Sequence, residues 1–155
     1  MSNLSHFDET GRVKMVDVSE KPVTTREAKA SARVLLSPST IEAICNYANP
    51  KGDPLEIARI AGIQAAKRTS ELIPLCHQIA LTSVDIDIEI ADDAVTINAT
   101  ARTSSQTGVE MEALTAVSIA ALTIYDMCKA FQKDIVITNI QLESKTGGKA
   151  DYVRK

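Results

Sequence analysis

Two acidic residues at opposite ends of one apolar stretch are the strongest candidates for chemistry. No charged side chain lies between Glu112 and Asp126, and most of the intervening residues are small and apolar. This pattern indicates a buried helix over residues 107–129. Thr107 followed by Glu110 predicts a capping box at its start. Each end of the helix would then present a carboxyl group suited to acid–base catalysis or ligand binding.

The spacing of Glu112 and Asp126 limits how they can act together. Fourteen residues of helix measure roughly 21 Å, and the two side chains differ in direction by about 40°. They are too far apart to serve one small pocket of one subunit, so we infer a site completed by a symmetric partner. The alternative is that they are solvated charges at the ends of a core helix, with Glu110 near the positive end and Lys129 near the negative end.

Asp126 and Lys129 share a helix face because they are three residues apart. Such a pair is usually a modest surface salt bridge. Next to a phosphate-rich pocket, it would instead act as a general base with a neighbouring cation.

Cys76 and His77 follow Pro74 at the edge of an apolar tract. His77 could transfer protons and Cys76 could line a pocket. The alternative is a small buried cysteine beside a histidine that is bonded to a carbonyl group. No metal site is expected, since the only other histidine is His6 and no Cys-x-x-Cys motif is present.

Two basic segments could bind anions. Lys51 lies next to the start of a helix, where free backbone N–H groups favour negative charge. Residues 144–149 form a predicted basic loop in which Gly147 and Gly148 could wrap a phosphate while Lys145 and Lys149 supply charge. Surface lysines are more commonly just solvated, and neither segment is a Walker-type loop.

Composition limits the class of protein. The chain has 155 residues, of which 45% are hydrophobic and only 3% aromatic, and its net charge is −3. We expect one domain over residues 1–155, with a mobile arm at 1–21, in which residues 15–18 could dock, and a polar tail at 150–155. The charge gives no reason to expect nucleic-acid binding, and no apolar run approaches membrane-spanning length. Three widely spaced cysteines favour a reduced, cytoplasmic setting.

Hydrophobic periodicity predicts an α+β fold, with a mostly antiparallel sheet and helices packed on one of its faces. Gly62, in the middle of a predicted helix, suggests close packing against another backbone. The expected strands are residues 24–36, 84–90, 95–101 and 135–142, and the expected helices are 37–48, 53–70 and 107–129.

Several segments of this chain together resemble the MoaC family of molybdenum-cofactor biosynthesis. The matching segments are residues 15–19, 49–69, 72–77, 107–116, 121–130 and the motif Lys145-x-Gly147-Gly148-Lys149. They cover nearly the whole chain in the expected order. The chain departs from the family pattern at Gln78, where proline is usual, and at Ala150-Asp151, where Ser-Gly is usual.

The resemblance implies a ferredoxin-like fold and a hexamer of three dimers with the active site between subunits. It implies a lyase that converts 3′,8-cyclised dihydro-GTP into cyclic pyranopterin monophosphate with release of pyrophosphate, without a cofactor. A transient contact with the radical-SAM enzyme that supplies the substrate is a further partner to test. The positions that match the family's site are Lys51, Leu75, Cys76, His77, Met111, Glu112, Asp126, Lys129 and Lys145.

The residues themselves suit this chemistry. Lysines near several loops would bind a triphosphate and stabilise departing pyrophosphate. As a hypothesis, Lys51 and Lys145 bind phosphates or polarise the ring, and Asp126 moves protons under the influence of Lys129. Glu112 and His77 orient the purine-derived ring. A non-catalytic nucleotide-binding homologue and a purely structural assembly protein are the two alternatives.

Overall fold

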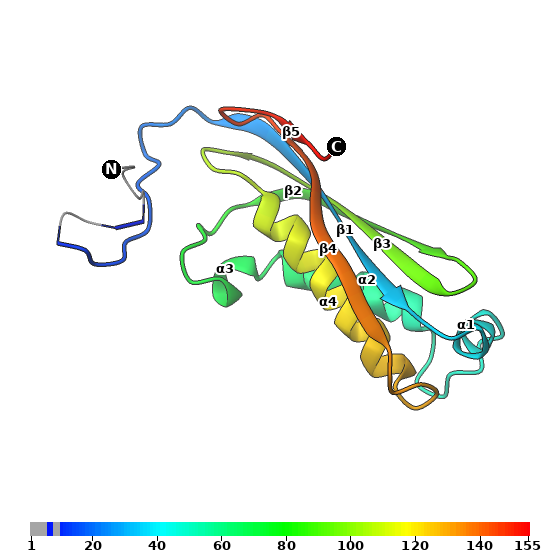
Figure 1. Ribbon diagram of the computed structural model, residues 1–155. Coiled ribbons are helices and arrows are strands. Elements are labelled where there is room, and N and C mark those ends of the chain that lie inside the picture. The colour runs from blue at the N-terminus through cyan, green and yellow to red at the C-terminus, as the bar shows by residue number, and fades with distance from the viewer. Residues whose placement is uncertain (1–5, 8–9) are drawn as a thin grey trace.

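The computed structural model, which describes residues 6, 7 and 10–155, is an antiparallel sheet with helices on one face (Figure 1). The strand order is β2-β3-β1-β4-β5. The predicted α+β, ferredoxin-like architecture is therefore confirmed. The elements are β1 Thr24–Leu35, α1 Pro38–Cys45, α2 Pro54–Ala66, α3 Thr69–Leu72, β2 Leu81–Ile90, β3 Ala94–Ser105, α4 Glu110–Cys128, β4 Val136–Thr146 and β5 Tyr152–Val153.

The central strand β1 follows from strict alternation along the chain. Ala28, Ala30, Ala32 and Val34 are buried on the face that the helices cover, while the residues between them face the other side. Alanine favours helix, but β1 is paired on both edges, with β3 and with β4. The pairing and the one-sided burial together outweigh the local helix preference.

Helix α4 packs closely because its buried side chains are small. Ala113, Ala116 and Ala120 are fully buried where α4 faces α2 and the sheet. On α2, a Cβ atom added at Gly62 would lie 2.9 Å from the carbonyl oxygen of Ala116 and 3.3 Å from the Cβ atom of Ala120. The predicted close approach at Gly62 is confirmed, and it sets the distance between the two helices.

The expectation that no segment approaches membrane-spanning length needs correction. Helix α4 has 19 residues and a mean hydropathy of 1.3, which is enough for a membrane span by length and composition alone. Most of its apolar side chains, however, face the sheet and α2 inside the fold, and Leu122 is the exposed exception among the large ones. The apolarity of α4 is therefore explained by its place in the core, as in a soluble protein.

Three predicted helix ends are wrong, the first being that of α1, which ends at Cys45 instead of residue 48. Helix α2 ends at Ala66 instead of continuing to residue 70: residues 67–68 form a turn and α3 follows from Thr69, whose buried hydroxyl donates a hydrogen bond to the Ala66 carbonyl (3.0 Å). Helix α4 begins at Glu110 with Val109 as its N-cap, and no side chain caps it. The capping box predicted for Thr107 and Glu110 does not form, since Glu110 binds Lys145 instead.

The C-terminal region is more ordered than predicted. Strand β4 continues through Lys145 to Thr146, so these residues are not part of a loop. The turn contains Gly147, whose φ of +83° favours glycine, and it returns the chain as β5. Tyr152 of β5 pairs with Lys145, which places the predicted polar tail against the sheet.

The predicted N-terminal arm is only partly described. Residues 1–5 and 8–9 lie outside the described residues, and the described part holds no helix or strand beyond an isolated bridge between Phe7 and Val13. The Val16 carbonyl contacts His77 (2.7 Å) and the Ser19 carbonyl accepts a hydrogen bond from Gln106 (3.1 Å). The expected docking of residues 15–18 is therefore confirmed at Val16.

Replacing Gly62 with alanine should destabilise the protein, because the added methyl group meets the Ala116 carbonyl and must push α2 away from α4. We expect the free energy of unfolding to fall by about 1–3 kcal/mol. Urea denaturation of Gly62→Ala would measure this change. Gln64→Ala, on the exposed side of α2, serves as the control, and equal stability of the two variants would contradict the close packing.

Candidate active site

One group of the predicted site residues lies at the C-terminal end of α4. Lys129 Nζ is 2.7 Å from Asp126 Oδ1, so the predicted pair is confirmed. Lys51, from the loop before α2, donates to Asp126 Oδ2 (3.2 Å) and to the Asp126 carbonyl (3.0 Å). We call Lys51, Asp126 and Lys129 the lysine–aspartate cluster.

Asn49 fixes the geometry of the lysine–aspartate cluster. Its buried side chain donates to the Met127 carbonyl (2.7 Å) and accepts from the backbone N–H of Lys51 (2.9 Å). These two bonds tie the loop before α2 to the end of α4. Sequence reasoning missed Asn49, although its place directly before Pro50 and Lys51 is typical of a side chain that organises a turn.

Asp126 is a carboxylate at neutral pH. Hydrogen bonds from Lys129 and Lys51, with the charges of both lysines, lower the pKa of Asp126 below its usual value. The same contact raises the pKa of Lys129. About half of each of the three side chains is exposed. The cluster is therefore charged, preorganised and open to solvent.

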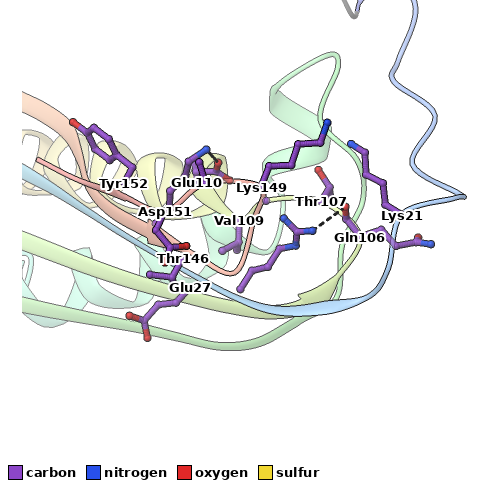
Figure 2. Close-up of a pocket in the computed structure, with 15 residues that line it drawn as sticks. Lys21, Glu27, Gln106, Thr107, Val109, Glu110, Thr146, Lys149, Asp151 and Tyr152 are labelled. Atoms are coloured by element: carbon purple, nitrogen blue, oxygen red, sulfur yellow. Dashed lines mark hydrogen bonds and ion pairs between the residues drawn. The ribbon is translucent and has the colours of Figure 1, made fainter.

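A groove lies at the other end of α4. Two adjoining cavities of about 510 and 530 Å³ share part of their walls, and we call the two together the groove. Figure 2 shows Lys21 and Lys149 extending to the same side beside Thr107 in the first of these cavities. The residues common to both cavities are Lys21, Thr107, Gly108, Glu110 and Lys149.

The inner part of the groove is a desolvated acidic pocket. Glu112 is only 4% exposed, and it lines the second cavity together with Leu75, Cys76, His77 and Met111. Burial, with a smaller contribution from the nearby charge of Glu110, raises the pKa of Glu112 to about 7. Burial and the proximity of Glu112 also raise the pKa of the Cys76 thiol. Five residues predicted for substrate binding thus meet in one cavity.

His77 has a fixed position in this pocket. Its Nε2 atom is 2.7 Å from the Val16 carbonyl oxygen, which ties the N-terminal segment to the pocket wall. The contact agrees with the alternative in which the histidine bonds to a carbonyl. The ring still lines the cavity, so the two interpretations of His77 do not exclude one another.

The outer part of the groove is basic. Lys145 lines it and donates to Glu110 Oε1 at 2.8 Å. Arg26 lines it too, held by the Ser105 and Gln106 carbonyls at 3.0 and 3.2 Å. Sequence reasoning did not single out Lys21, Arg26 or Glu110 as site residues. The feature that could have identified Arg26 as a site residue is its place at the start of β1, opposite the end of β3.

The predicted site residues thus fall into two groups at the two ends of α4. Neither cavity is lined by Lys51, Asp126 or Lys129, and the groove residues lie about four helical turns from that cluster. Among the described residues, no group of three or more His, Cys, Asp or Glu side chains gathers as metal ligands would. The titratable and cationic side chains of the two groups can transfer protons and bind anions.

Fold and sites together define the class of the protein: an α+β protein of ferredoxin-like layout with a groove that is basic outside and acidic within. A sequence model of the MoaC family matches residues 15–148, and the chain belongs to this family. Cyclic pyranopterin monophosphate synthase from Streptomyces griseus subsp. griseus is 58% identical over 154 residues, covering 99% of this chain and 87% of that protein. The synthase of the same name from Streptomyces coelicolor is 57% identical over 152 residues, covering 97% and 89%.

Replacing Glu112 with glutamine should stabilise the protein at high pH. Because the pKa of Glu112 rises from 4.5 to about 7 on folding, ionisation costs the folded state free energy as the pH increases through this window. Above pH 7 we expect Glu112→Gln to be more stable than the unmodified chain by up to about 3 kcal/mol, and near pH 4 by almost nothing. Urea denaturation across this range tests the prediction. The exposed Glu42→Gln is the control, and a pH-independent difference would contradict a neutral Glu112.

Proposed function

We propose that this chain is an enzyme of molybdenum-cofactor biosynthesis, a cyclic pyranopterin monophosphate synthase. It converts (8S)-3′,8-cyclo-7,8-dihydroguanosine 5′-triphosphate into cyclic pyranopterin monophosphate and pyrophosphate. The observation that carries this proposal is the family match over residues 15–148, together with relatives of that name that are about 58% identical over nearly the whole chain.

The groove is the proposed binding site for the nucleotide-derived substrate. Its outer part, with Lys21, Arg26, Lys145 and Lys149, supplies the several cations that a triphosphate needs. Its inner part, with Glu112 and the neighbouring residues 75–77 and Met111, holds the purine-derived ring. Glu112 titrates near neutral pH, so it can accept a hydrogen bond from the ring or donate one.

The lysine–aspartate cluster is the proposed catalytic group. The reaction opens and closes rings and forms a cyclic phosphate as pyrophosphate leaves, so it needs proton transfer and positive charge but no redox chemistry. Asp126, held ionised by Lys51 and Lys129, accepts a proton from the substrate. The two ammonium groups stabilise negative charge that develops beside it.

Because groove and cluster lie at opposite ends of α4, one complete site requires two chains. We propose a symmetric dimer in which the groove of one subunit faces the cluster of its partner, with three dimers forming a hexamer. The half-exposed charges of the cluster support this arrangement, since a partner would cover them. A transient contact with the radical-SAM enzyme that makes the substrate, and a cytoplasmic location, complete the proposal.

Replacing Asp126 with alanine should abolish product formation while the oligomer remains intact. Removing a general base typically costs about a hundredfold or more in rate. Pyrophosphate release from the cyclised triphosphate measures activity, and sedimentation measures assembly. Asp92→Asn, in the exposed turn between β2 and β3, is the control.

Near-normal turnover by Asp126→Ala would refute its catalytic role. If the unmodified chain binds the substrate tightly without releasing pyrophosphate, the protein is a non-catalytic nucleotide-binding homologue. If its lysines respond to no nucleotide at all, the structural alternative holds.

A further inference from the structure

We propose that Glu110 is a positioning residue, which holds the Lys145 ammonium group at the wall of the groove, and that Gly108 provides the space this requires. The inference rests on the proposed function, because Lys145 is one of the phosphate-binding lysines of that proposal. It assigns Glu110 a role that acts through Lys145, not by contact with the substrate.

The first supporting observation is the contact itself. Lys145 lies on β4 and Glu110 on the first turn of α4, yet their charged atoms are 2.8 Å apart. A lysine side chain is flexible and loses about 2 kcal/mol of rotamer entropy when it is fixed in one geometry. A partner fixed to a buried helix can impose that geometry before the substrate arrives. The ammonium group has three N–H donors, so one bond to Glu110 leaves two for phosphate oxygens.

The second observation is that, of the carboxylates in this cavity, Glu110 is the one that pairs with Lys145. Two other acids line the same cavity, but both have partners of their own. Glu27 pairs with Arg102 (2.6 Å), and Asp151 accepts from the Gly147 backbone N–H (3.2 Å). Burial alone would raise the pKa of Glu110. The bond from Lys145, the backbone N–H of Glu110 itself and the charge of Arg26 outweigh it and lower this pKa.

The third observation concerns Gly108. A Cβ atom at this position would overlap the Glu110 carboxyl group, whose Cδ atom would be 2.7 Å away. Glycine therefore lets the Glu110 side chain fold back over the start of α4 toward Lys145. The overlapping atoms belong to the end of a flexible side chain, so an alanine at 108 can be accommodated if the carboxylate moves. Gly108→Ala thus displaces the carboxylate without removing either charge.

The test compares Glu110→Gln and Gly108→Ala with the unmodified chain in pyrophosphate release and in binding of inorganic tripolyphosphate. If Glu110 positions Lys145, both variants lose about tenfold to a hundredfold in kcat. Tripolyphosphate should bind Glu110→Gln more tightly, because all three N–H donors of Lys145 are then free for phosphate oxygens. A purely structural role would weaken binding and assembly as well. Glu89→Gln, exposed on β2, is the control and should change neither quantity.

A double-mutant cycle tests whether Glu110 acts through Lys145. In a Lys145→Ala background, Glu110→Gln should have no further effect on kcat. Full additivity of the two losses, or a kcat of Glu110→Gln within twofold of the unmodified chain, would overturn the proposal. If the unmodified chain releases no pyrophosphate, the proposed function fails by itself. The tripolyphosphate measurements then still decide the proposal, since Glu110→Gln should alter binding only while Lys145 is present, and an equal change in the Lys145→Ala background would overturn it.

Discussion

The close packing of α4 against the sheet and α2 is the constraint on which the rest of the structure depends. Alanines along α4 and Gly62 on α2 remove the side-chain bulk that would separate the two helices. A helix buried in this way is rigid, and no small motion can bring its two ends together. Because Glu112 and Asp126 are parts of one rod, the distance between groove and lysine–aspartate cluster is fixed by the fold.

The two ends of this rod offer opposite electrostatic environments. At the N-terminal end, burial raises the pKa of Glu112 to about 7, so this carboxyl group can donate or accept a hydrogen bond near neutral pH. At the C-terminal end, Lys129 and Lys51 lower the pKa of Asp126, which suits a permanently ionised carboxylate. One helix thus carries two carboxyl groups whose pKa values shift in opposite directions.

Local rules predicted much of this fold from sequence. The alternation in β1, the start of α2 near residue 53 and the pair of Asp126 with Lys129 each depend on neighbours within a few residues. The close approach at Gly62 involves distant residues, but the glycine itself marks the position. The failures arise where a distant residue competes. Glu110 leaves the predicted capping box because Lys145, 35 residues later, offers a charged partner. Tyr152 forms β5 because it meets the extended end of β4.

The same contrast applies to the candidate site. Sequence spacing and family resemblance identified the groove residues 75–77, Met111, Glu112 and Lys145, which line the cavities. Arg26 and Asn49 were missed because their roles exist only after β1 pairs with β3 and the loop before α2 meets the end of α4. No local pattern encodes such long-range contacts, whereas charge and spacing within one helix are visible directly.

The most direct test of a site shared between subunits is activity in mixed oligomers. One chain would carry Asp126→Ala, which disables its cluster, and the other Lys145→Ala, which impairs its groove. If each site combines the groove of one subunit with the cluster of its partner, equimolar co-assembly restores about a quarter of the normal activity, since one site in each mixed dimer is intact. Activity no greater than that of the two separate variants, in oligomers shown to contain both chains, would contradict the shared site.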